Sequence, residues 1–302
     1  MQLFRKYSLF SLALTVLVIV WGAYVRASGS GAGCGSHWPL CNGQIIPSTE
    51  REKTLIEFSH RLSSGILLIL VVGLFLWAMR IFPKRTFAFK AAFFSLIAIL
   101  MEALIGALLV LLRLVEQDQS VLRVFSISLH LVNTLFLLAA LACTAFGSTR
   151  ENARWRWPDR KEAWKPRTLL LGFVVLGALG AVAALGDTLF PPNSLKSGII
   201  ADFSSQAHIA ERIRFLHPLL AVGWVFAASS WIFGIWEKTP TLIRLGKGVI
   251  SLSILNLFLG LANILFLAPI LLQSLHLFVA NLLWIVFVWF ILTAASSEQW
   301  QR

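Results

Sequence analysis

Of the 302 residues in this chain, 58% are hydrophobic and only 13% are charged, about half the charged share of an ordinary soluble domain. This composition excludes a soluble globular protein and indicates a helical protein that crosses a membrane many times. The formal net charge of +12 follows from the placement of basic loops, described below, and predicts no nucleic-acid partner. Three cysteines do not make a disulfide scaffold.

Eight apolar runs approach roughly 20 residues, the length that a helix needs to cross a bilayer. We expect the first run to be a membrane span rather than a cleaved signal peptide, because it continues through Trp21 and Arg26 into the loop that follows. The pattern predicts an all-α integral membrane fold with spans at residues 8–26, 56–79, 88–112, 121–146, 168–187, 209–235, 246–267 and 270–295.

Basic residues gather on one side of the predicted membrane. The N-terminal tail, the C-terminal residue and the loops after the second, fourth and sixth spans hold most of the 26 Lys and Arg. Because such loops stay in the cytoplasm, we expect both termini to be cytoplasmic. The chain is therefore predicted to be a multi-pass protein of the cytoplasmic (inner) membrane.

Short motifs recur on the two sides of a polar, basic loop at residues 147–167. The second span carries His60, and the sixth span carries His217. The other recurrences are Ser-Leu-His-Leu at 128–131 and 274–277, and Glu102-x-x-x-Gly106 against Asn256-x-x-x-Gly260.

These recurrences predict a duplicated unit of four helices. Four spans return the chain to the side on which it began, so two copies in tandem form a parallel repeat. We expect two pseudo-symmetric four-helix bundles, an N-terminal one at residues 1–150 and a C-terminal one at residues 151–302.

Four histidines lie on the even-numbered spans, each within roughly 10 residues of the non-cytoplasmic end of its helix. At ~1.5 Å rise per residue, all four lie in the outer half of the bilayer. Two imidazoles per bundle suit a haem iron, for which two axial histidines are an established arrangement, whereas zinc needs three or four ligands. A proton relay is the alternative. The four are His60, His130, His217 and His276.

The two halves differ beside their histidines. Glu57 precedes His60 by one helical turn, and the matching position in the second half is Arg214. A carboxylate beside a metal site can accept a proton or orient water, whereas an arginine pairs with an anion such as a haem propionate. This difference predicts that the first half carries out the reaction and that the second half holds a bound cofactor. The alternative is that Glu57 only caps its helix and that the side chain of Arg214 only extends toward water.

Cys34 and Cys41 are separated by six residues in a glycine-rich loop at residues 27–55. The predicted topology places this loop outside the cytoplasm, where disulfides persist. We expect the two cysteines to be bridged. Their spacing leaves open whether the bridge is only structural or also exchanges electrons.

Four motifs of this chain occur together in one family. They are Gly22-Ala-Tyr-Val-Arg26, Trp38-Pro39-Leu40-Cys41-Asn42-Gly43, Glu57-Phe-Ser-His60-Arg61 and Leu185-Gly-Asp-Thr-Leu-Phe-Pro191. With them, nearly the whole chain resembles haem A synthase, a membrane enzyme that oxidises haem O to haem A. The chain departs from this family at Glu102, where Gln is more usual, and lacks the second cysteine pair that some members carry before Arg212.

The resemblance implies a role for each histidine. The first half would hold the substrate, haem O, between His60 and His130, which with Glu57 form the catalytic site. The second half would hold haem b between His217 and His276. The reaction converts a porphyrin methyl group to a formyl group by two successive hydroxylations.

The resemblance also implies partners. Electrons would pass to a quinone or another acceptor, haem O would arrive from haem O synthase, and membrane lipid would surround the protein. The sequence does not reveal the oligomeric state, for which a homo-oligomer is one alternative. Two other functions compete with this one: a dihaem electron carrier that catalyses nothing, and a proton-coupled transporter. Glu57 beside only one of the two sites favours the enzyme, since a simple carrier needs no such asymmetry.

Overall fold

The structure, a computed structural model, describes residues 1–48, 51–149, 164–235 and 239–296. Within these residues the chain forms helices and no β-strand, and eight helical segments are long and apolar enough to cross a membrane. The predicted all-α integral membrane fold with eight spans is confirmed. The chain is a multi-pass membrane protein.

The first four spans are α1 (Gln2–Ala27), α2 (Glu52–Ile81), α3 (Phe87–Leu111) and α4 (Val121–Gly147). The fifth span is α5 (Trp164–Leu189), and the sixth, Ile209–Ile235, consists of α7 (Ile209–Arg212) and α8 (Leu216–Ile235). The last two are α9 (Pro240–Leu265) and α10 (Ile270–Ser296), and the short helix α6 (Leu195–Asp202) lies between α5 and α7.

Capping residues begin several of these helices. A bilayer offers no water to backbone groups, so a spanning segment must bond its backbone internally, and the first N–H groups need another acceptor. The hydroxyls of Thr86, Ser120 and Thr239 accept hydrogen bonds from the backbone N–H three residues further on. Pro240, at the first position of α9, lacks the N–H that would otherwise need a partner.

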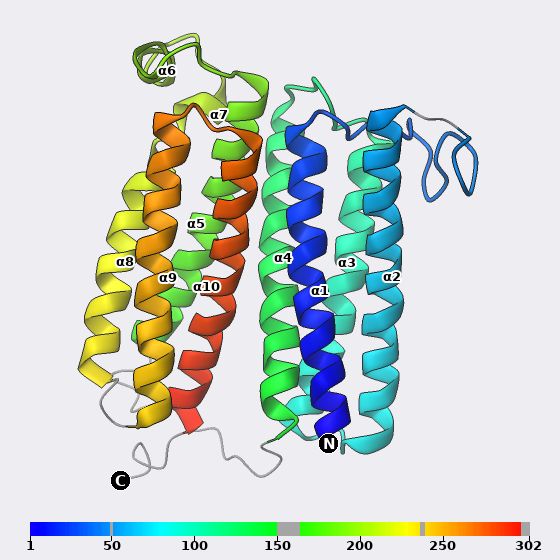
Figure 1. The fold of residues 1–302 in the computed structure, drawn as a ribbon, viewed down its shortest axis with the longest axis vertical. Helices are drawn as coiled ribbons and strands as arrows, with labels where there is room; N and C mark the ends of the chain where they lie inside the picture. Colours follow the sequence, from blue (N-terminus) through cyan, green and yellow to red (C-terminus); the bar gives the residue numbers. More distant parts are fainter. Residues whose placement is uncertain (49–50, 150–163, 236–238, 297–302) are drawn as a thin grey trace.

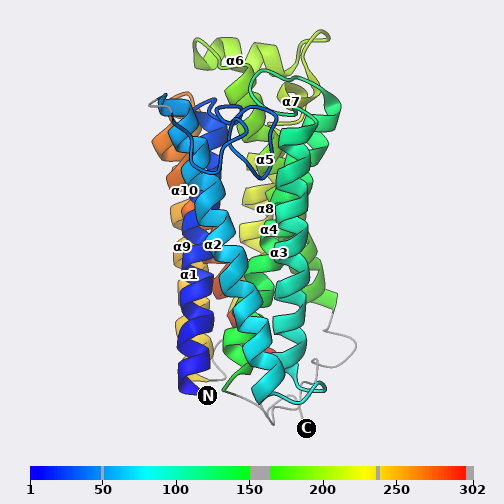
Figure 2. The same cartoon turned by 90° about the vertical axis from the view of Figure 1, so that its right-hand side faces the viewer.

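The helices stand in two groups, α1–α4 beside α5, α8, α9 and α10, and α1 begins and α10 ends at the lower end in Figure 1. We call the opposite end the loop end; there α2, α4, α7 and α10 begin, and α6 lies across it (Figures 1 and 2). The predicted boundary between bundles, at residues 150 and 151, lies outside the described residues.

The two groups meet along α4 and α10, with α1 and α5 beside them. Two indole N–H groups of α10 donate hydrogen bonds to carbonyl oxygens of α4: Trp284 to Leu135 at 2.8 Å and Trp289 to Ala142 at 3.1 Å. Both α4 and α10 therefore contribute to the contact between the groups, and α10 has the largest buried share of the eight spans found in the described residues.

Candidate functional site

All four predicted histidines lie at one depth. His60 is the ninth residue of α2, His130 the tenth of α4, His217 the ninth of the span Ile209–Ile235 and His276 the seventh of α10. These four helical segments all begin at the loop end, so the imidazoles lie roughly 10–15 Å below it at ~1.5 Å per residue.

The structure brings the histidines together in two pairs. The rings of the second pair, His217 and His276, have centroids 6.1 Å apart and planes at 84°. Two imidazoles that bind one metal from opposite sides, each nitrogen about 2 Å from it, have ring centres about 6–6.5 Å apart. The first pair, His60 and His130, also lie within electrostatic range of each other.

One ring nitrogen of His217 has a hydrogen-bond partner in the structure. Nδ1 of His217 lies 3.1 Å from the backbone oxygen of Leu176. If this nitrogen carries the proton and donates it, Nε2 is an unprotonated acceptor, which is the form that binds a metal. No group of three or more His, Cys, Asp or Glu among the described residues could hold a metal ion. The ring separation of the second pair suits two imidazoles that bind one haem iron.

A glycine on a neighbouring helix lies against each imidazole. A Cβ built on Gly22 of α1 would stand 2.8 Å from Cε1 of His60, and one on Gly180 of α5 would stand 2.9 Å from Cε1 of His217. At Gly260 of α9 the distance to Cε1 of His276 would be 3.3 Å. The fourth glycine is Gly106 of α3, where a built Cβ would stand 3.9 Å from Cε1 of His130, the longest of the four distances.

Gly180→Ala is therefore expected to reduce haem binding at the second pair while leaving the first pair loaded. The added methyl group overlaps the imidazole of His217, and relieving an overlap of this kind costs about 1–3 kcal/mol or displaces the ring. The measurement is haem content per protein, by absorbance. Gly223→Ala on α8 is the matched control, because a Cβ there meets nothing within 4 Å; equal loss in both variants would contradict the prediction.

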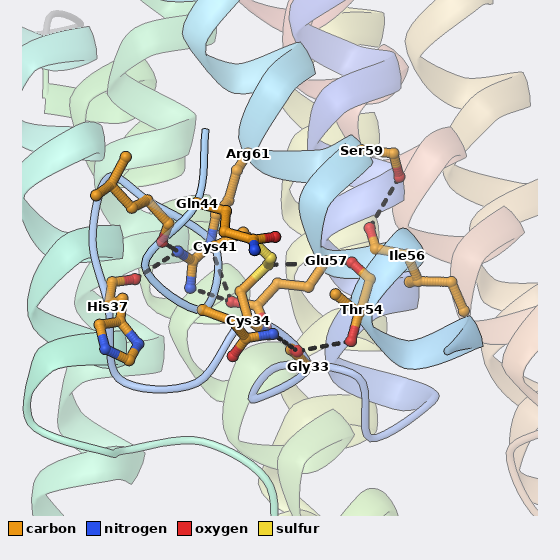
Figure 3. Close-up of a disulfide and its surroundings, with 12 residues drawn as sticks. Gly33, Cys34, His37, Cys41, Gln44, Thr54, Ile56, Glu57, Ser59 and Arg61 are labelled. Atoms are coloured by element: carbon orange, nitrogen blue, oxygen red, sulfur yellow. Dashed lines mark hydrogen bonds and ion pairs between the residues drawn. A yellow bond between two sulfur atoms is a disulfide. The ribbon is translucent and has the colours of Figure 1, made fainter. Parts of the chain in front are cut away.

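Glu57 is buried, with 3% of its surface exposed, and lies beside the first loop (Figure 3). Oε2 accepts a hydrogen bond from the backbone N–H of Cys34 at 2.7 Å, and Oε1 accepts one from Nε of Arg61 at 3.0 Å. Its hydrogen bonds thus go to the loop and to the next turn of α2. They do not cap the start of α2, so the capping interpretation is wrong.

Arg61 completes the attachment of this loop to α2. Its Nη2 pairs with Glu57 at 2.5 Å, and its Nη1 donates to the backbone oxygens of His37 at 2.6 Å and Leu40 at 2.8 Å. These oxygens lie between Cys34 and Cys41, which form the predicted disulfide. The bridged loop is therefore fixed to α2 by the ion pair that lies beside His60.

Arg214 has carboxylate partners of its own. Its guanidinium pairs with Asp187 at 3.1 Å and with Asp202 at 2.5 Å, and it donates to the backbone oxygen of Gly198 at 3.2 Å. Burial raises the pKa of Asp202, and the guanidinium opposes that rise. A haem propionate, the predicted partner of Arg214, would have to share it with these carboxylates. Asp187 lies within α5 and is ion-paired.

Sequence reasoning missed the contacts of two glycines with histidines and the contacts of one arginine between the two halves. Gly22 and Gly180 precede His60 and His217 by nearly the same number of residues, a signal that the duplication contained. Arg26 stood out only as part of a motif, yet it joins the two halves: it donates to the backbone oxygen of Ala184, to Oγ1 of Thr188 and to Oε1 of Gln273.

The fold and site define an eight-span helical membrane protein with two histidine pairs, one of them beside a disulfide loop that a buried carboxylate anchors. The family model described as COX15-CtaA, cytochrome oxidase assembly protein, matches residues 5–288. The chain belongs to this family, and its predicted membership of the haem A synthases is confirmed.

The relatives of this chain carry two different names. A protein of Thermus thermophilus named protoheme IX farnesyltransferase is 40% identical over 294 residues, which are 95% of this chain and 47% of that protein. A heme A synthase of Exiguobacterium sibiricum is 35% identical over 140 residues, 45% of this chain and 46% of the relative. The chain spans about half the length of these curated relatives.

Proposed function

We propose that this protein is a haem A synthase, which oxidises a methyl group of haem O to the formyl group of haem A. One observation carries the proposal: two histidine pairs lie at one depth, and a buried carboxylate stands one turn from only the first of them. In this proposal, haem O is the substrate held by His60 and His130. A resident haem b, held by His217 and His276, would supply electron transfer when bound.

The reaction requires both water and an electron acceptor. A methyl group and one water molecule give a formyl group, four protons and four electrons. A quinone, or another acceptor of electrons in the membrane, would take the electrons. Glu57 is the side chain that we assign to the protons and to orienting water, since a fixed carboxylate can do both. Arg61 and the N–H of Cys34 hold that carboxylate in place.

The second half has no carboxylate at the matching position, because Arg214 stands there. Its ion pairs with Asp187 and Asp202 connect the turn between α7 and α8 with α5 and α6 beside the second pair. We assign to this half a bound cofactor and no chemistry on the porphyrin. If a propionate approaches Arg214, the charge-assisted hydrogen bonds would add to the two histidine ligands.

The proposed partners follow from the substrate. Protoheme IX farnesyltransferase, the name of the Thermus relative, describes attachment of a farnesyl group to protohaem, the step that makes haem O. A haem O synthase would therefore supply the substrate. The match covers 47% of that relative, so its name does not assign farnesyl transfer to this chain. We further propose a cytoplasmic-membrane location, cytoplasmic termini and a homo-oligomer.

The test is production of the protein in a host that makes haem O but no haem A. Extracted pigments are separated and identified by absorbance and mass spectrometry. Haem A in the extract, with haem b in the purified protein, supports the proposal. Haem b without haem A would favour the dihaem electron carrier, and a protein without haem would overturn both. A rise in farnesylated haem alone would assign farnesyl transfer instead.

A further inference from the structure

A carboxylate lies within the membrane-spanning region beside the first histidine pair. Glu102 of α3 accepts a hydrogen bond at Oε2 from Nδ2 of Asn133, at 2.5 Å, and at Oε1 from the hydroxyl of Thr134, at 2.6 Å. Ionisable side chains at this depth are costly and commonly functional. Two hydrogen bonds from α4 fix the position of this one.

The same carboxylate reaches the imidazole of His130. Oε1 of Glu102 lies 3.2 Å from Nδ1 of His130. That nitrogen is buried and has no aligned hydrogen-bond partner in the structure, so a small rotation of the ring is needed to point its N–H at the carboxylate. A metal-binding histidine almost always donates its second N–H to such an acceptor, which fixes the tautomer and raises the basicity of the ligand.

The second half offers a different group at the equivalent place. Asn256 precedes Gly260 by four residues, as Glu102 precedes Gly106. Gly260 and Gly106 face His276 and His130 respectively. The side-chain oxygen of Asn256 is buried without a hydrogen-bond partner. The two halves therefore differ in charge beside equivalent histidines.

We propose that Glu102 is a positioning residue that holds His130 with its proton on Nδ1 and makes it a more electron-donating ligand than His276. This rests on the proposed function, because it needs iron at the first histidine pair. A more basic ligand stabilises ferric over ferrous iron, so Glu102 would lower the reduction potential of a haem held by the first pair. Glu102 thereby gives the two sites different potentials, as Glu57 gives them different proton chemistry.

The experiment is a redox titration of the purified protein loaded with iron protoporphyrin IX, followed by absorbance. In Glu102→Gln the potential of one haem component is expected to rise, because an amide oxygen is a weaker acceptor than a carboxylate. The other component should stay unchanged. Asn256→Glu is the mirror variant and should lower the potential of that other component. If Glu102→Gln moves neither component, or if both variants move the same one, the proposal is overturned.

Thr134→Val separates the electronic effect from a packing effect. It removes the hydroxyl donor to Glu102 but keeps the carboxylate next to Nδ1. Because the carboxylate then has one donor fewer, it accepts more strongly from the imidazole. The reduction potential of the same haem component should therefore fall or stay unchanged. A rise like that of Glu102→Gln would show that disturbed packing alone explains both and would overturn the proposal.

Failure of the proposed reaction is distinguishable from failure of this role. Potentials that shift as expected, in a protein that makes no haem A, would uphold the role of Glu102 and overturn only the reaction. If the unaltered protein binds no bis-histidine haem, both are overturned.

Discussion

His217→Ala is expected to abolish the low-spin bis-histidine spectrum of one haem and to leave the other in place. His217 faces His276 at a ring separation that fits a shared metal, and the variant removes one of the two ligands. Changing an outer-shell partner alone typically costs 10–100-fold in metal affinity. We therefore expect haem content at this site to fall by at least about tenfold. The measurement is absorbance of the oxidised and reduced protein, with haem quantified per polypeptide.

The matched control is His37→Ala, which removes an exposed imidazole of the first loop. Only the backbone oxygen of His37 binds Arg61, so this variant should keep both haems. His60→Ala should remove the other component of the spectrum. An unchanged bis-histidine spectrum in His217→Ala would show that His217 is not a haem ligand.

Glu57→Gln is expected to keep haem b and to lower haem A output by about 10²-fold or more, the usual contribution of a positioned proton-transfer group. Haem O or a partly oxidised intermediate should accumulate. The amide keeps the size of the side chain but loses its charge. One of the two donors at this site, Arg61 or the N–H of Cys34, would then face an NH₂ group. Separation and mass spectrometry of the extracted haems measure the outcome.

Two further variants identify the reason for such a loss. Glu52→Gln changes an exposed acid on the first turn of the same helix and should leave haem A output unchanged. Arg61→Leu keeps the carboxylate but releases the loop from α2. If its loss of haem A equals that of Glu57→Gln, the role of Glu57 is to anchor the disulfide loop. Unaltered haem A output in Glu57→Gln would show that Glu57 is not a catalytic residue.

The spans and the depth of the histidines could be predicted because lipid permits few alternatives. A spanning segment must satisfy its own backbone, so an apolar run of sufficient length becomes a helix, and counting along it gives depth. This is why all eight spans agree with the structure and His60, His130, His217 and His276 lie near one level. The bridge between Cys34 and Cys41 followed from loop length and topology.

The partners of each side chain could not be read in the same way. A helix that is apolar all round has no pattern that fixes which face turns inward, and small residues and hydrogen bonds set the packing instead. The contacts of Gly22 and Gly180 with histidines depend on that rotation, as does the approach of Glu102 to His130.

Glu57 and Arg214 illustrate the limit. Their sequence positions placed a carboxylate and a guanidinium at equivalent points of a repeat. Only the tertiary structure decided that Glu57 would bind a loop and Arg214 two aspartates. Both outcomes depend on segments that are distant in sequence and that pack together at the loop end. A buried charge needs a partner there because its desolvation is costly, and the packing of the chain determines which groups lie close enough.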